Sequence, residues 1–342
     1  MNGPILVTGA GGVGKTTVSA ALGVAAAQAG YETLVLTVDP ARRLATALGL
    51  DALHNVPTAN EKLPTLWAAM LDSEASWDQI ARSHAPPEAA DRLVNSEFFH
   101  AITRHFPASQ SYAAAEAMAQ HLDERRWDVV IVDTPPASGG IEFFTAPNEL
   151  TNLVGGRLFR WLTGGAIPGR RELFNVAARP ALRIVDIALG SDLLERVGAF
   201  LFDLRTTYDG LRKRSQDIEK YFRRSTTIVV TTSDPAPVAE AARFFKELPQ
   251  VARPPAAIVF NRTLPASWEE AEIPSDATRA LARNLALWAR EAHRQETVRD
   301  EFAARYRTSI VSIPWKPTAP TDLTSLADLI KDTGLVADLV GS

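Results

Sequence analysis

The sequence predicts an α/β fold: a mostly parallel, doubly wound sheet covered by helices on both faces, with a helical subdomain inserted. Short apolar runs rich in β-branched residues recur along the chain and alternate with helical patterns, which is typical of buried parallel strands joined by crossover helices. One long segment, residues 147–225, instead contains helical patterns only. We therefore expect one α/β sheet domain formed by residues 1–146 and 226–342, with residues 147–225 as a helical insertion.

The predicted strands share a short length and a majority of apolar side chains. Helices are expected between them, and the clearest starts with Ser275 as its N-cap and continues past Trp288. Ligands of open parallel sheets bind at the carboxyl ends of the strands, so residues that follow these runs are the first candidates for a site. The runs are residues 5–8, 33–38, 65–70, 127–133, 226–231, 256–260 and 309–313.

Residues 9–17 read Gly-Ala-Gly-Gly-Val-Gly-Lys-Thr-Thr and contain the phosphate-binding pattern of Gly, four residues, Gly, Lys, then Ser or Thr. A predicted strand precedes them and an Ala-rich helical pattern follows, which is the context that this motif needs. Glycines let backbone N–H groups surround phosphates at the positive end of a helix. The pattern predicts a P-loop nucleotide-binding fold in which Lys15 contacts the β- and γ-phosphates and the Thr16 hydroxyl ligates Mg²⁺.

Three polar residues follow or end predicted strands near this loop. Asp133 is placed to hold Mg²⁺, directly or through a water molecule, and Asp39 could orient or deprotonate a water attacking the γ-phosphate. Each could instead be a helix cap. The amide of Asn261 could read a base edge, although an asparagine in a turn is the better interpretation of that residue alone. Arg42 and Arg43 are either phosphate partners or part of a solvated helix face.

Composition narrows the possible classes of protein. The 342 residues carry a net charge of −4, which gives no basic field for nucleic acid, so no nucleic-acid partner is expected. Cysteine is absent, which excludes disulfides and thiolate zinc sites. No apolar run approaches the ~20 residues of a membrane span, and the first predicted strand begins too close to Met1 for a signal peptide. We expect a cytoplasmic location.

Five spaced motifs together resemble those of the ArsA-like ATPases, which include arsenite-pump ATPases and ATPases that deliver tail-anchored membrane proteins. The motifs occur in the family's order and cover nearly the whole chain, and the closest likeness is to the bacterial anion-transporting ATPase branch. They are the glycine motif at 9–17, Val-Asp-Pro-Ala at 38–41, Asp-Thr-Pro-Pro at 133–136, Phe-Asn-Arg-Thr at 260–263 and Ser-Ile-Pro-Trp at 312–315.

The resemblance implies a role for each matched position. Asp39 would be the switch I acid that orients the attacking water, and Asp133 the switch II acid near Mg²⁺. Asn261 would contact adenine, with Pro314 and Trp315 flanking the base. ATP is expected rather than GTP, because the Asn-Lys-x-Asp guanine reader is missing. The phosphate cradle would be formed by Gly11, Gly12, Val13, Gly14, Lys15, Thr16 and Thr17.

The chain departs from the family at two points. Related phosphate loops have a second lysine where this chain has Ala10, and that lysine reaches the phosphates of the facing subunit. Arg42, Arg43 or a related partner chain could supply the missing charge. The eukaryotic targeting ATPases also join their dimer through paired cysteines on zinc, so a metal-free contact or a different partner must replace that clamp here. A homodimer and a heterodimer with a related ATPase therefore both remain open.

We predict a Mg²⁺-ATP-dependent ATPase of ArsA-like type that acts as a dimer and couples hydrolysis to movement of its helical subdomain. The alternative is a non-hydrolysing nucleotide-binding subunit of a heterodimer. Apolar stripes at residues 150–162 and 193–222 could form a groove for a hydrophobic client or a membrane-protein segment, or could pack against each other as core.

Overall fold

The computed structural model describes residues 3–38, 43–106, 108–135, 141–156, 191–268 and 278–335. The chain divides into two compact units. The first consists of Met1–Leu71, Ala117–Phe144 and Lys220–Ser342, and the second of Asp72–Glu116 and Thr145–Glu219. The second unit thus contains residues 72–116, which the sequence prediction places in the sheet domain. The division of function among the three predicted domain segments remains a prediction.

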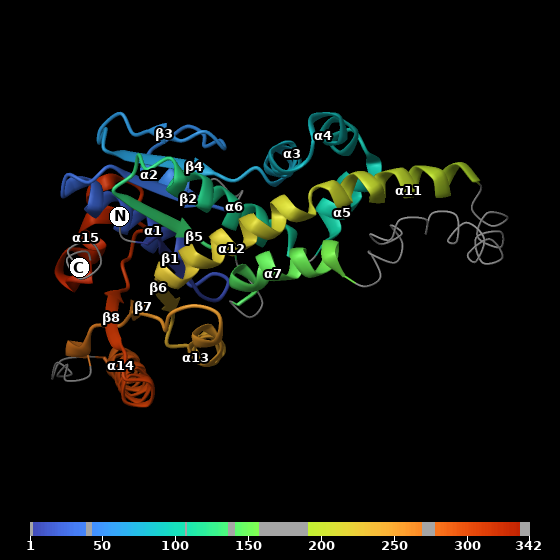
Figure 1. Ribbon diagram of the computed structural model, residues 1–342. Coiled ribbons are helices and arrows are strands. Elements are labelled where there is room, and N and C mark those ends of the chain that lie inside the picture. Colours follow the sequence, from blue (N-terminus) through green and yellow to red (C-terminus); the bar gives the residue numbers. More distant parts are fainter. Residues whose placement is uncertain are drawn as a thin grey trace. The chain divides into compact units, whose positions relative to one another are not determined.

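The first unit is built on an eight-stranded sheet in the order β3-β4-β2-β5-β1-β6-β7-β8 (Figure 1). Every neighbouring pair is parallel except β3 and β4, which are antiparallel. The predicted mostly parallel α/β fold is confirmed. The strands are β1 (Ile5–Thr8), β2 (Thr33–Thr37), β3 (Thr58–Ala59), β4 (Leu66–Met70), β5 (Val129–Asp133), β6 (Thr226–Thr231), β7 (Ala257–Thr263) and β8 (Ser309–Pro314).

Strand register brings the polar ends of three strands together. Asp133, the last residue of β5, pairs with Val7 of β1 on one side and with Thr37 of β2 on the other. β1 lies between β5 and β6, so the loop after β1 leaves the sheet beside the end of β5. The carboxyl ends of central strands are where an open parallel sheet binds ligands. The sheet therefore positions the glycine loop and Asp133 as neighbours.

Helices α1 (Lys15–Gln28), α2 (Arg43–Leu48) and α15 (Leu323–Ile330) share one apolar core with the sheet. Side chains alternate along each strand, so Ile5 and Val7 of β1 face this core. α1 is Ala-rich and buried on most sides, because small side chains let it lie close to the sheet. A Cβ on Gly23 would stand 2.3 Å from Val35 Cγ2, which shows how close that approach is.

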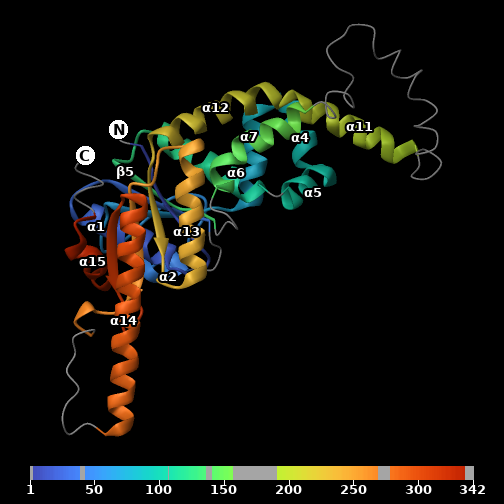
Figure 2. The same cartoon turned by 90° about the horizontal axis from the view of Figure 1, so that it is seen from below.

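Aromatic residues pack on the rest of the first unit. Phe222 lies 5.2 Å from Phe143 and 5.0 Å from Phe144, ring centroid to centroid, and Phe144 lies 6.0 Å from Phe244. α14 forms one long helix (Figure 2), and its Phe302 ring lies 6.0 Å from Phe260 of β7. The other helices that belong wholly or partly to this unit are α6 (Ser109–Asp123), α7 (Glu142–Gly155), α12 (Tyr208–Arg224), α13 (Pro235–Glu247) and α14 (Arg279–Tyr306), with the short turns η1 (Leu248–Gln250), η2 (Ala266–Trp268) and η3 (Lys331–Thr333).

Every described element of regular secondary structure in the second unit is a helix. It contains α3 (Ser73–His84), α4 (Pro87–Val94), α5 (Glu97–His105) and α11 (Ser191–Thr206), together with parts of α6, α7 and α12. Ion pairs connect sequence-distant helices within it. Arg92 of α4 binds both carboxylate oxygens of Asp203 of α11, at 2.8 and 2.7 Å. Arg214 of α12 binds Glu116 of α6 at 2.8 Å.

Two details of the fold differ from the sequence prediction. α14 begins at Arg279, because the side chain of Thr278 caps it by accepting a hydrogen bond from Leu281 N at 3.3 Å. The predicted N-cap, Ser275, lies outside the described residues. β3 was not predicted, since a strand of two residues leaves no readable alternation of polar and apolar side chains.

Candidate nucleotide-binding site

The loop between β1 and α1 depends on glycine at several positions. Gly12 has φ 78° and Gly14 has φ 98°, values that strongly favour a residue without a Cβ. Gly14 is the residue that precedes the first turn of α1, where unpaired backbone N–H groups and the helix dipole favour an anion. This loop has the backbone conformation and the position of a phosphate cradle.

The ammonium group of Lys15 lies over this loop. Its Nζ donates hydrogen bonds to the carbonyl oxygens of Gly9, at 2.9 Å, and Ala10, at 3.0 Å. The residue is buried, with 7% of its surface exposed. The positive charge is therefore held where the loop would present it to a phosphate. Ala10, which occupies the position of the family's second lysine, contributes only its backbone carbonyl to this arrangement.

A carboxylate and two hydroxyls meet at the ends of β5, β2 and α1. Thr16 Oγ1 donates to Asp133 Oδ2 at 2.6 Å, and Thr37 Oγ1 donates to the same oxygen at 2.9 Å. Asp133 is 2% exposed. Thr37 was not among the predicted site residues, although a polar residue at the end of an apolar strand is a readable signal. Hydroxyl and carboxylate oxygens are the hard ligands that Mg²⁺ prefers, so Thr16 and Asp133 fit the predicted ion.

Asn261 lies against the phosphate loop. Its Nδ2 donates to Val13 O at 2.8 Å, and its Oδ1 accepts from the backbone N–H of Arg262 at 2.9 Å. Gly14 approaches it so closely that an added Cβ would stand 2.2 Å from Asn261 Nδ2. In this structure the amide therefore joins the end of β7 to the loop. Its role in reading adenine remains a prediction.

Pro314 and Trp315 stand at the end of β8. Trp315 donates its backbone N–H to Thr263 O at 2.8 Å, which ties it to the end of β7. Half of its surface is exposed. The indole is thus free to stack on a flat ligand at the carboxyl edge of the sheet, and the predicted contact with the base remains a prediction.

The switch I prediction cannot be placed on this structure. Asp39 and Arg42 lie outside the described residues, and Arg43 is described only by its backbone at the start of α2. Among the residues that are described, no three His, Cys, Asp or Glu side chains come together as a metal cluster. The Thr16 and Asp133 pair is the arrangement that matches the sequence-predicted metal site.

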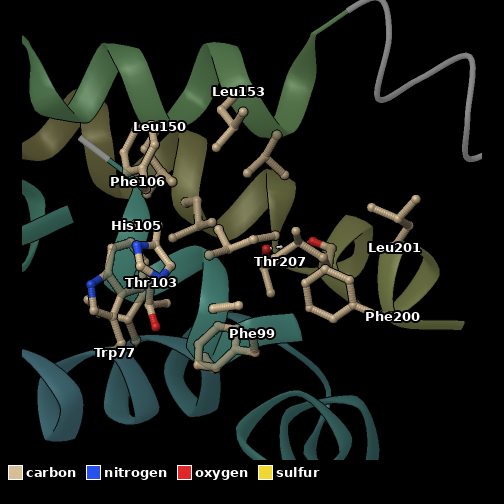
Figure 3. Close-up of a pocket in the computed structure, with 17 residues that line it drawn as sticks. Trp77, Phe99, Thr103, His105, Phe106, Leu150, Leu153, Phe200, Leu201 and Thr207 are labelled. Carbon is tan, nitrogen blue, oxygen red and sulfur yellow. Dashed lines mark hydrogen bonds between the residues drawn. The ribbon is translucent and has the colours of Figure 1, made fainter. Parts of the chain in front are cut away.

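The second unit contains an apolar cavity of about 510 Å³ (Figure 3). Side chains from α3, α5, α7, α11 and α12 line it, and the rings of Trp77, Phe99 and Phe200 are among them. Leu150 of α7 and Leu211 of α12, from the two predicted apolar stripes, are also in the lining. Three other residues of the first stripe, Leu158, Trp161 and Leu162, lie outside the described part of the chain. None of the described helices is long and apolar enough to cross a membrane.

A parallel sheet with a glycine loop after its central strand, a buried lysine on that loop and a Thr–Asp pair at the strand ends defines a P-loop nucleotide-binding protein. Comparison with known families then identifies the kind. The model of the anion-transporting ATPase (ArsA) family matches residues 3–286, and the chain belongs to that family. The family predicted from the five motifs is confirmed.

Individual relatives share less than a third of their aligned residues with this chain and differ from it in length. The chain is 30% identical over 147 residues to the "Putative arsenical pump-driving ATPase" of Halobacterium salinarum, which covers 42% of this chain and 22% of that protein. It is 24% identical over 263 residues to the "ATPase ASNA1 homolog" of Cryptosporidium parvum, covering 76% of this chain and 65% of that protein. The matched part of the chain thus spans less than two thirds of either relative.

Proposed function

We propose that the protein is a Mg²⁺-dependent ATPase of ArsA-like type. The observation that supports this most directly is the hydrogen-bonded group of Thr16, Asp133 and Thr37 beside the loop that holds Lys15. It unites hard oxygen ligands and a buried cation at the N-terminus of α1, which suits a nucleoside triphosphate with its metal. Family membership favours ATP as that triphosphate.

Each residue has a defined task in this proposal. Loop N–H groups bind the phosphates, and Lys15 exchanges its contacts with Gly9 O and Ala10 O for contacts with phosphate oxygens. Thr16 and Asp133 would hold Mg²⁺, and Thr37 keeps the Asp133 carboxylate oriented. Bound there, Mg²⁺ would supply positive charge beside the transferred phosphoryl group. Asp39 orients the attacking water.

Two substitutions test these tasks separately. Lys15→Ala removes the charge opposite the β- and γ-phosphates, and we expect it to abolish tight ATP binding. Asp39→Asn should still bind ATP but hydrolyse it at least ~100-fold more slowly, the usual effect of a lost general base. Equilibrium binding of a fluorescent ATP analogue and steady-state phosphate release measure the two effects. Hydrolysis at the wild-type rate by Asp39→Asn would remove Asp39 from the mechanism.

A non-hydrolysing subunit is the second candidate, and Ala10 is the observation in its favour. No second cation stands at that loop position, and loss of a cationic finger lowers phosphoryl-transfer rates ~10³-fold. If Arg42 or Arg43 serves instead, the lone protein hydrolyses ATP and its Arg→Ala variant loses most of that activity. If a related partner serves in a heterodimer, the lone protein is nearly inactive until the partner is added. Full activity of both arginine variants without a partner contradicts both ideas.

We further propose that the helical unit binds a hydrophobic segment of a client in the cytoplasm and moves as ATP is hydrolysed in a dimer. The apolar cavity lined by Phe200 supports the first part, because a sizeable apolar cavity suits an apolar ligand. A photo-crosslinker at Phe200 should label membrane-protein segments in a nucleotide-dependent manner. Phe202, an exposed residue on the same helix that does not line the cavity, is the matched control. Equal labelling from both positions would argue that the cavity is only packing.

A further inference from the structure

We propose that the free edge of β8 binds an extended, basic peptide segment of a partner protein as a ninth strand. β8 is the last strand of the sheet that the described residues form, so none of the described strands pairs with one side of its backbone. A groove of about 440 Å³ follows this edge between β8 and the C-terminal end of α15 with η3. This inference rests on the sheet and not on the proposed ATPase activity.

Two hydrogen bonds show which backbone groups point to the free side. The carbonyl oxygen of Ile313 accepts from Thr263 Oγ1 at 3.2 Å, and the N–H of Trp315 donates to Thr263 O at 2.8 Å. Thr263, the last residue of β7, is the partner in both bonds, so odd-numbered residues at this end of β8 direct their backbone groups toward β7. Backbone direction alternates along a strand. The N–H and C=O groups of Ile310 and Ser312 therefore point outward.

These outward groups coincide with the groove. Ile310, Ser312 and Pro314 all line it. Pro314 has no N–H, so donors for strand pairing are confined to Ile310 and Ser312, while all three residues offer a carbonyl. An edge with regularly spaced donors and acceptors is complementary to one kind of ligand, another extended strand. The opposite edge of the sheet offers much less, because β3 has two residues.

Charge in the groove selects the class of peptide. Asp328 of α15 and Asp332 of η3 line it and are exposed, and Lys316 is the only cation of the described lining. Neither aspartate forms an ion pair with another described residue. Side chains of an added strand alternate between its two faces, so basic residues at every second position would lie toward these carboxylates. A second copy of β8 suits the groove less, because Ser309–Pro314 contains no basic residue.

The test uses the full-length protein and a fluorescein-labelled hexapeptide of alternating lysine and valine, with binding followed by fluorescence anisotropy. We expect saturable binding that weakens with added salt. Ser312→Pro removes one of the two outward donors, and proline is tolerated on an edge strand when its N–H side faces solvent. This variant should keep the wild-type unfolding temperature and bind the peptide about 10-fold more weakly. Ser312→Ala, which keeps the N–H, is the matched control and should bind like wild type.

The acidic charge of the groove allows a second, independent test of the proposal. The double change Asp328→Asn with Asp332→Asn should weaken binding and flatten its salt dependence, and a peptide with glutamate in place of lysine should bind more weakly than the lysine peptide. Absence of saturable binding, or wild-type affinity in a folded Ser312→Pro variant, would overturn the proposal. If sedimentation shows a dimer of the protein alone that Ser312→Pro dissociates, the edge pairs with a second copy and the peptide proposal is wrong.

Discussion

Replacing Gly14 by alanine measures how closely the phosphate loop fits the end of β7. Two separate costs to the free energy of unfolding add at this position. A left-handed backbone conformation costs a non-glycine residue ~1–2 kcal/mol. The new Cβ would also stand 2.2 Å from Asn261 Nδ2, so the amide must give up its hydrogen bond to Val13 O, a loss of ~1–3 kcal/mol for a buried group. We expect Gly14→Ala to lower the free energy of unfolding by ~2–5 kcal/mol.

The same loop supplies two matched controls. Gly12 has φ 78° and nothing within 4 Å of an added Cβ, so Gly12→Ala should show the backbone term alone, ~1–2 kcal/mol. Gly11 has neither constraint, and Gly11→Ala should change stability by less than ~0.5 kcal/mol. Urea unfolding of the nucleotide-free protein measures all three.

A double variant separates the steric term from the backbone term. In the double variant Gly14→Ala with Asn261→Ala, the Asn261 amide is absent, so the new Cβ at position 14 has nothing to displace. The changes in free energy of unfolding from the two substitutions should therefore be non-additive by ~1–3 kcal/mol. Equal effects of Gly12→Ala and Gly14→Ala, or strict additivity in the double variant, would refute the steric part of the reasoning.

Three further predictions concern stability. Burial, and next the positive charge of Arg214, hold the pKa of His84 below its ordinary value of 6.5, so the unfolded chain binds a proton first as the pH falls. Stability should be complete above about pH 6.5 and decline below it, and His84→Gln should flatten this decline in urea titrations. Glu116→Ala removes the partly buried partner of Arg214 and should lower the free energy of unfolding by ~2–4 kcal/mol in the same assay. The loss of an exposed ion pair would lower it by less than ~1 kcal/mol. Phe222→Ala should lower the free energy of unfolding by ~3–5 kcal/mol, since its ring fills an aromatic cluster; a loss below ~1 kcal/mol would show that the cluster is not core.

Local patterns predicted the sheet well, because each buried parallel strand is an apolar run that stands out from its surroundings. The runs at residues 5–8 and 226–231 correspond to β1 and β6 without any shift. At β7 the strand continues beyond the apolar run to Thr263, since pairing with β8 persists through polar residues. Strand pairing is a non-local property, and composition of a single run does not reveal where it stops.

In the candidate site, too, some residues follow from local sequence patterns and others depend on which strands are neighbours. Lys15, Thr16 and Asp133 follow from a local motif and from strand ends, and the structure brings them together. Thr37 joins Asp133 only because β2 and β5 are neighbours in register, which no stretch of sequence states by itself. The contact of Asn261 with Val13 O spans most of the chain and likewise depends on the folded sheet. The switch I position around Asp39 remains a prediction.

The hydrogen bonds of Lys15 have a consequence for the heat of ligand binding. In this structure its ammonium donates to two loop carbonyls, at 2.9 and 3.0 Å. A phosphate that recruits Lys15 replaces these bonds with new ones, so the number of bonds made by the ammonium changes little. The contribution of Lys15 to the enthalpy of nucleotide binding should therefore be smaller than its contribution to the affinity. Released water and counterions contribute to the entropy of binding.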